Sequence, residues 1–115
     1  MNDIFILSAV RTPIGSLNGT LANYTAPQLA GKAASEAITK AGVQSEELGE
    51  VVFGCVLSAG IGQAPARQAA IAAGIPVSVG ATTVNKVCGS GMKAVMMVSP
   101  ALHRARSRRC RRSRS

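Results

Sequence analysis

Residues 25–57 read TAPQLAGKAASEAITKAGVQSEELGEVVFGCVL, a pattern that predicts a helix followed by a buried strand. Thr25 and Gln28 have the spacing of a capping box, and apolar residues then recur three and four positions apart. Gly42 is typical of the residue that follows a helix. Residues 51–57 form a continuous apolar run, which is typical of a strand covered on both faces in a parallel sheet.

The same alternation continues on both sides of this stretch. Residues 4–10 are a second continuous apolar run, residues 65–73 predict a helix that begins at a proline, and residues 81–85 predict another strand. A third helix is expected from Cys88 onward. The predicted order is β-α-β-α-β-α, an α/β fold with a largely parallel sheet. No strand pattern follows the third helix, so we expect an incomplete sheet.

The formal net charge of +8 is not spread evenly along the chain. Residues 1–98 contain six basic and five acidic residues, for a net charge of +1, whereas residues 99–115 contain seven arginines and no acid. We therefore divide the chain into a partial globular domain, residues 1–98, and an Arg/Ser-rich tail, residues 99–115. Because such a tail cannot bury an apolar face, we expect it to be disordered on its own.

Composition argues against membrane and metal-binding classes. No apolar run approaches the roughly 18 residues that a membrane span requires. Cys55, Cys88 and Cys110 form no Cys-x-x-Cys pair, and His103 is the single histidine, so we expect no metal site. The N-terminus lacks the basic and long apolar regions of a secretion signal. We therefore expect a cytoplasmic protein with reduced thiols and no membrane association.

Residues 84–94 read VNKVCGSGMKA and place Cys88 between a strand and a helix. A thiolate at that position faces the positive end of the helix dipole and free backbone N–H groups, and the neighbouring glycines leave room for a substrate. Cys88 is therefore a candidate nucleophile. From spacing alone, a small buried packing residue is the more common explanation, and both remain open. Cys55 lies within an apolar strand, so we expect it to pack in the core.

Three segments together resemble the N-terminal part of the thiolases. They are SAVRTPIG at 8–15, GCVLSAG with GQAPARQ at 54–60 and 62–68, and NKVCGSGMKA at 85–94. The segments stand in the family's order and cover about residues 3–97. The Cys-Gly-Ser-Gly-Met form favours the acetoacetyl-forming branch, the acetyl-CoA acetyltransferases, over the long-chain degradative branch. The resemblance implies a thiolase-like N-terminal half.

The resemblance implies a role for Cys88 as the acyl-accepting nucleophile, with coenzyme A thioesters as substrates and no separate cofactor. Family members also use a Gly-His-Pro segment, a Cys-x-Gly-Gly-Gly segment and an Asn-Glu-Ala segment, and none of these is in this sequence. We therefore expect the chain to be inactive alone. Thiolase subunits pair through this half, which makes Gln63 and Arg67 candidate contacts in a homo-oligomer.

The tail admits further explanations. Its arginines favour non-specific, salt-sensitive binding of nucleic acid, so the alternative function is a small α/β domain with a basic arm. A second explanation is out-of-frame translation, because Arg codons that begin with CG, read one base later, encode the Val, Ala, Asp and Gly composition of a buried strand. On that hypothesis the chain is the product of a disrupted gene.

Overall fold

The computed structural model describes residues 3–112, with side chains as far as residue 105. Its elements are helix α1, the short 3-10 helix η1, strand β1, helix α2, strand β2 and helix α3. Their bounds are, in that order, Ala26–Ala41, Ser45–Glu47, Glu50–Gly54, Pro65–Ala72, Gly80–Val84 and Ser90–Arg112. The predicted helices and two of the three predicted strands are therefore present.

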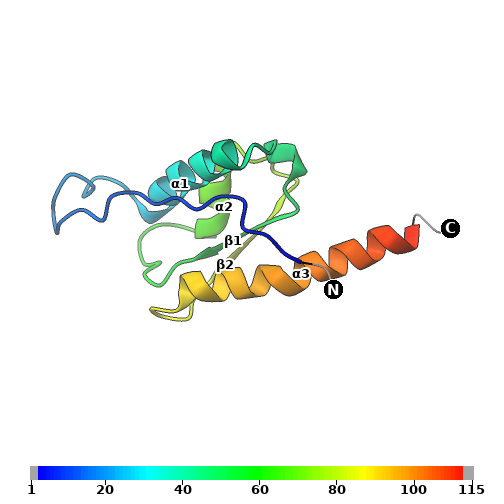
Figure 1. Ribbon diagram of the computed structural model, residues 1–115. Helices are drawn as coiled ribbons and strands as arrows, with labels where there is room; N and C mark the ends of the chain where they lie inside the picture. Colours follow the sequence, from blue (N-terminus) through cyan, green and yellow to red (C-terminus); the bar gives the residue numbers. More distant parts are fainter. Residues whose placement is uncertain (1–2, 113–115) are drawn as a thin grey trace.

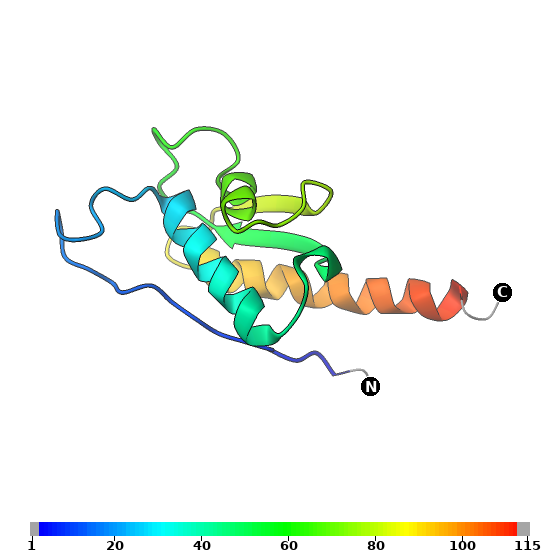
Figure 2. The same cartoon turned by 90° about the horizontal axis from the view of Figure 1, so that it is seen from above.

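The elements form three layers around a small sheet. Helix α2 packs on one face of β1 and β2, α1 packs against α2, and α3 lies across the opposite face (Figure 1). Seen from above, α3 extends well past the end of the sheet (Figure 2). The described chain is elongated for this reason, with extents of 57 × 27 × 25 Å.

Strands β1 and β2 pair in parallel, with Glu50 opposite Gly80 and Gly54 opposite Val84. The parallel connection through α2 confirms the predicted α/β class. Small and branched side chains fill the core between the sheet and α2. The buried cluster consists of Val51, Ala70, Ile75 and Val79, with Ile38, Leu48, Phe53, Ala73 and Ala81 packed around it.

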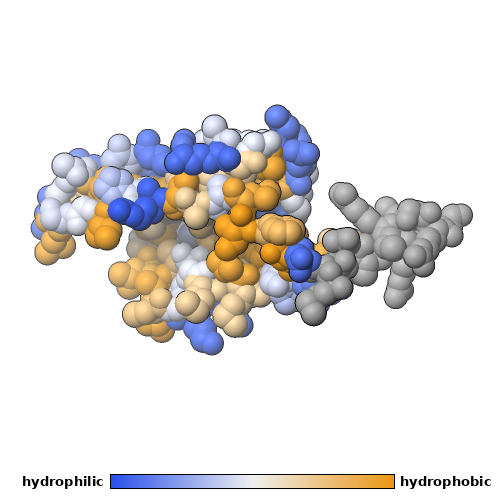
Figure 3. Space-filling view, in the orientation of Figure 1, coloured by the Kyte–Doolittle hydropathy of each residue, from blue (hydrophilic) through white to orange (hydrophobic). Residues whose placement is uncertain are grey.

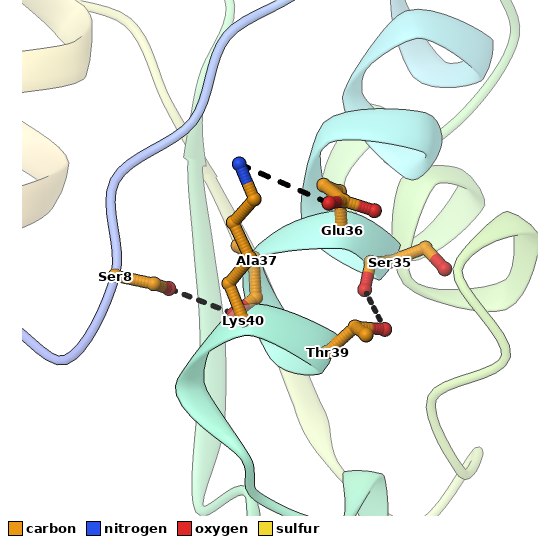
Figure 4. Close-up of polar contacts among 6 residues, drawn as sticks. All are labelled: Ser8, Ser35, Glu36, Ala37, Thr39 and Lys40. Atoms are coloured by element: carbon orange, nitrogen blue, oxygen red, sulfur yellow. Dashed lines mark hydrogen bonds and ion pairs between the residues drawn. The ribbon is translucent and has the colours of Figure 1, made fainter.

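Helix α1 forms where the capping pattern predicts it. The Thr25 side chain accepts a hydrogen bond from the Gln28 backbone N–H, and the Gln28 side chain accepts one from the Thr25 backbone N–H at 2.8 Å. Gly42 ends the helix in the left-handed conformation, with φ of 69°. Near this end, Lys40 pairs with Glu36 at 3.9 Å (Figure 4).

The prediction of a strand over residues 4–10 is wrong for this structure. These residues form an extended segment with no strand partner, and Ser8 Oγ instead donates a 2.7 Å hydrogen bond to the Ala37 carbonyl of α1 (Figure 4). An apolar run indicates that a segment suits burial, but a strand also needs a ladder of backbone partners. Neither β1 nor β2 supplies one here. The side chains of Phe5, Ile6 and Leu7 are consequently exposed.

The backbone of residues 99–112 is helical, where the sequence analysis predicted disorder. These residues continue α3, which contains Pro100 and ends at Arg112. The composition of residues 99–115 does not report the preceding turns of α3. Those turns pack on β1 and complete the costly nucleation step of the helix. Alanine, leucine and arginine are good helix formers, so extension from an existing helix is favourable. The prediction for residues 113–115 lies outside the described residues.

Candidate active site around Cys88

The candidate site lies at the carboxyl edge of the parallel sheet. β1 and β2 end at opposite members of the same register pair, so the segments that follow them leave side by side. The Cys55 N–H donates to the Val84 carbonyl at 2.9 Å, and Asn85 Nδ2 donates to the Val56 carbonyl at 3.5 Å. Ligand sites in open α/β sheets form at this edge.

Cys88 occupies a tight turn between β2 and α3. The Gly89 N–H donates to the Lys86 carbonyl at 2.9 Å, and the Ser90 N–H donates to the Val87 carbonyl at 3.3 Å. These bonds close a tight turn over residues 86–90, which contains Cys88. The Cys88 thiol is free and the residue is exposed. The strand, turn and helix around it are those that the sequence predicts.

Two polar side chains stabilise this turn through hydrogen bonds to its backbone. Ser90 is 6% exposed, and its hydroxyl accepts from the Lys86 N–H at 2.8 Å and donates to the Val87 carbonyl at 2.6 Å. Asn85 Oδ1 accepts from the Val87 N–H at 3.0 Å. The sequence analysis did not single out either residue. Asparagine after a strand and serine at a helix start are both typical of side chains that bond to nearby backbone, and that signal was available.

The first turn of α3 sits directly on β1. An added Cβ at Gly54 would lie 2.5 Å from the Ser90 carbonyl carbon and 2.6 Å from the Gly91 nitrogen. Glycine at position 54 therefore allows the helix that follows Cys88 to approach the strand closely. This contact fixes the height of the helix start, and with it the position of Cys88, above the sheet.

The chemistry available at Cys88 is nucleophilic. The thiol is exposed, its neighbour Gly89 has no side chain, and the turn leads directly into a helix N-terminus. Backbone N–H groups in the first turn of a helix lack intrahelical acceptors and favour nearby negative charge. An oxyanion that forms on a substrate bound beside such N–H groups is stabilised by them. The role of Cys88 in catalysis stays a prediction.

The other sequence candidates are not gathered around Cys88. His103 lies thirteen residues beyond the start of α3, about 20 Å along the helix axis. Cys55 is half-buried, and its thiol lies 3.7 Å from the Leu57 carbonyl. Among the described residues no group of three or more His, Cys, Asp or Glu side chains is suited to hold a metal. Cys110 lies outside the residues whose side chains are described.

Gln63 and Arg67 lie on the connection from β1 to α2 and on α2 itself. Gln63 is exposed, and its carbonyl accepts from Gln68 Nε2 at 2.7 Å. Arg67 is half-buried, and its Nη1 is buried without a hydrogen-bond partner in the described part of the chain. Their assignment as subunit contacts stays a prediction.

These features define a class: a cysteine presented on a strand–turn–helix unit of a parallel α/β fold. The thiolase N-terminal domain model matches residues 4–108. The chain belongs to the thiolase family. The match includes residues 99–108, which the sequence analysis assigned to the tail. The division of the chain after residue 98 stays a prediction.

The relatives are acetyl-CoA acetyltransferases. The mitochondrial acetyl-CoA acetyltransferase of Mus musculus is 54% identical over 102 residues, which are 89% of this chain and 24% of that protein. The acetyl-CoA acetyltransferase of Cupriavidus necator is 52% identical over 102 residues, 89% of this chain and 26% of the relative. A cytosolic acetyl-CoA acetyltransferase of Gibberella zeae is 53% identical over 94 residues, 82% of this chain and 24% of the relative. The chain therefore spans about a quarter of the length of these curated relatives.

A solved structure shares the fold. A thiolase from Ascaris suum, crystallised in complex with coenzyme A, superposes with a TM-score of 0.84 at 46% sequence identity, covering 89% of this chain and 27% of that chain. The relatives come from both mitochondria and cytosol. In the part of the chain that the structure describes, no helix is long and apolar enough to cross a membrane.

Proposed function

We propose that this chain supplies the N-terminal, acyl-accepting part of an acetyl-CoA acetyltransferase. The observation that carries the proposal is the exposed Cys88 thiol at the start of α3, at the carboxyl edge of the sheet. The similarity to acetyl-CoA acetyltransferases over 89% of the chain supports it.

In the proposed reaction the Cys88 thiolate attacks the thioester carbonyl carbon of acetyl-CoA. The carbon–sulfur bond to coenzyme A breaks, coenzyme A leaves as a thiolate that takes up a proton, and the acetyl group stays on Cys88. A second acetyl-CoA then loses an α-proton, and its carbanion attacks the acetyl carbonyl. A carbon–carbon bond forms as the bond to Cys88 breaks, which releases acetoacetyl-CoA. The covalent intermediate divides one difficult condensation into two easier steps.

The proposal assigns the remaining catalytic steps to family segments that are not found in these 115 residues. In the family, a histidine activates the nucleophile and a second cysteine moves the α-proton, as the resemblance implies. His103 does not fit the first role, because α3 carries it far from Cys88. This chain is therefore proposed to require the other part of a thiolase for turnover.

The distribution of apolar surface supports that requirement. Apolar side chains gather on the face formed by the N-terminal segment and the first half of α3 (Figure 3). On α3, Met92, Val95 and Met96 are 73%, 65% and 60% exposed. Contiguous apolar surface of this kind marks contact with another polypeptide segment. The acetyl-CoA acetyltransferases that match are about four times as long as the matched region.

Three finer assignments belong to the same proposal. Coenzyme A thioesters are the substrates, which is supported by the Ascaris suum structure with bound coenzyme A, and no separate cofactor is needed. The protein acts in the cytoplasm, as the Gibberella zeae relative does. Gln63 and Arg67 contribute to a subunit interface.

A chimera tests the proposed function. The segment of the Mus musculus relative that matches this chain is replaced by the corresponding segment of this chain, and coenzyme A-dependent cleavage of acetoacetyl-CoA is measured. We expect activity that disappears in the Cys88→Ala chimera and persists in the Cys55→Ala chimera. A soluble, folded chimera without activity would contradict the proposal, as would activity that survives Cys88→Ala.

A further inference from the structure

The residue before Cys88 has an unusual backbone conformation. Val87 has φ of 47°, in the left-handed region that β-branched residues rarely adopt. Such a conformation persists only where the surroundings hold it. The Val87 side chain is 66% exposed, so core packing does not supply that restraint.

Hydrogen bonds to the backbone of Val87 supply the restraint instead. The Val87 N–H donates to Asn85 Oδ1 at 3.0 Å, and the Val87 carbonyl accepts from Ser90 Oγ at 2.6 Å. Both backbone polar groups of the strained residue are therefore held by side chains. Ser90 Oγ also accepts from the Lys86 N–H, which ties the two sides of the turn together.

Ser90 is itself held in place. It is buried, and its backbone lies against Gly54 of β1, where no Cβ fits. Its hydroxyl is thus fixed relative to the sheet rather than free to follow the turn. Asn85 is anchored through Nδ2, which donates to the Val56 carbonyl.

We propose that Ser90 and Asn85 are positioning residues that hold Val87 in the left-handed conformation and thereby fix the position of Cys88 just before the first residue of α3. Neither side chain is assigned a contact with substrate. They act through the peptide that precedes Cys88. The inference deepens the proposed function, because it explains how this fold presents the acyl-accepting thiol.

The first test measures alkylation of Cys88 in the full chain. Ser90→Ala and Asn85→Ala are treated with iodoacetamide, and mass spectrometry of peptides compares the labelling rates of Cys88 and Cys55. We expect Cys88 to react about two- to fivefold more slowly, the size of a helix N-terminus effect on an exposed anion, with no change at Cys55. Ser99→Ala, which removes a hydroxyl further along α3, is the matched control and is expected to leave both rates unchanged.

The second test asks whether the effect passes through Val87. Asparagine adopts the left-handed conformation more readily than valine, so Val87→Asn is expected to restore most of the lost Cys88 rate in both variants. A purely structural role for Ser90 or Asn85 predicts no such rescue. Unchanged Cys88 labelling in the single variants, or absence of rescue, would overturn the proposal.

General loosening of the fold and loss of positioning at Cys88 alone give different labelling results. If Ser90→Ala loosens the fold, Cys55 labelling rises. The comparison of Asn85→Ala with the double variant Asn85→Ala/Val87→Asn then decides the matter, because Asn85 is exposed and its replacement is not expected to loosen the fold. Iodoacetamide needs neither coenzyme A nor the rest of a thiolase. The labelling rates therefore test the role of Ser90 and Asn85 independently of the chimera, whose activity tests the proposed function.

Discussion

Replacing Gly54 with alanine is expected to destabilise the chain by separating α3 from β1. The new Cβ would meet three backbone atoms of the first turn of α3: the Ser90 carbonyl carbon at 2.5 Å, the Gly91 nitrogen at 2.6 Å and the Ser90 oxygen at 2.7 Å. Ordinary contact begins at 3.4 Å, so the backbone of the helix or the strand must shift by roughly 1 Å. No flexible side chain is available to absorb that shift.

The magnitude follows from two opposing terms. Overpacking a fitted contact costs about 1–3 kcal/mol. A Gly→Ala change also restricts the unfolded chain and returns about 0.4–1 kcal/mol. We therefore expect a net loss of about 1–2 kcal/mol in the free energy of unfolding, measured by urea titration followed by circular dichroism.

Gly80→Ala is the matched control for this measurement. Gly80 pairs in the same sheet, and a Cβ there meets nothing within 4 Å. That variant is expected to be unchanged or slightly more stable, by up to about 1 kcal/mol. Equal losses in the two variants, or a neutral Gly54→Ala, would refute the close approach of α3 to β1.

Three further predictions follow from the same structure. Gly31→Ala places a Cβ 2.7 Å from the Ala72 Cβ, so α1 and α2 must separate; we expect a loss of about 1 kcal/mol that Ala72→Gly relieves, by urea titration. Thr25→Ala removes the hydroxyl that accepts from Gln28 N–H at 3.3 Å and is expected to cost about 1 kcal/mol, whereas Thr25→Ser retains most of the cap. The unmodified chain is expected to show no cleavage of acetoacetyl-CoA, because each absent general acid or base typically supplies ~10²–10⁴-fold in rate; turnover that depends on Cys88 would contradict this.

Local signals in the sequence predicted the helices and the strand–turn–helix around Cys88. The capping box at Thr25 and the glycine at position 42 act within a few residues, so they are legible without tertiary contacts. The strand expected at residues 4–10 depended on a neighbouring strand, which periodicity does not report. The helical backbone beyond residue 98 depended on a helix already nucleated against β1, which the composition of the tail does not report.

The candidate site was predictable in part for the same reason. Cys88 could be chosen because its position before a helix start is a matter of sequence order. The close contact of Gly54 with the first turn of α3 could not be predicted, because β1 and α3 are far apart in the sequence and meet only in the folded chain. The hydrogen bonds from Ser90 and Asn85 to the backbone of Val87 are local in sequence. Their importance could be recognised only once the left-handed φ of Val87 was known from the structure.

The most direct test of the central claim is to trap the acyl group. The chimera is mixed with acetyl-CoA, quenched in acid, digested and analysed by mass spectrometry for acetylated peptides. The account predicts a labile acetyl group on the peptide that contains Cys88, lost on treatment with coenzyme A and absent from the Cys88→Ala chimera. An active chimera whose acetyl group resides on Cys55 or on any other residue, with Cys88 unmodified, would contradict it.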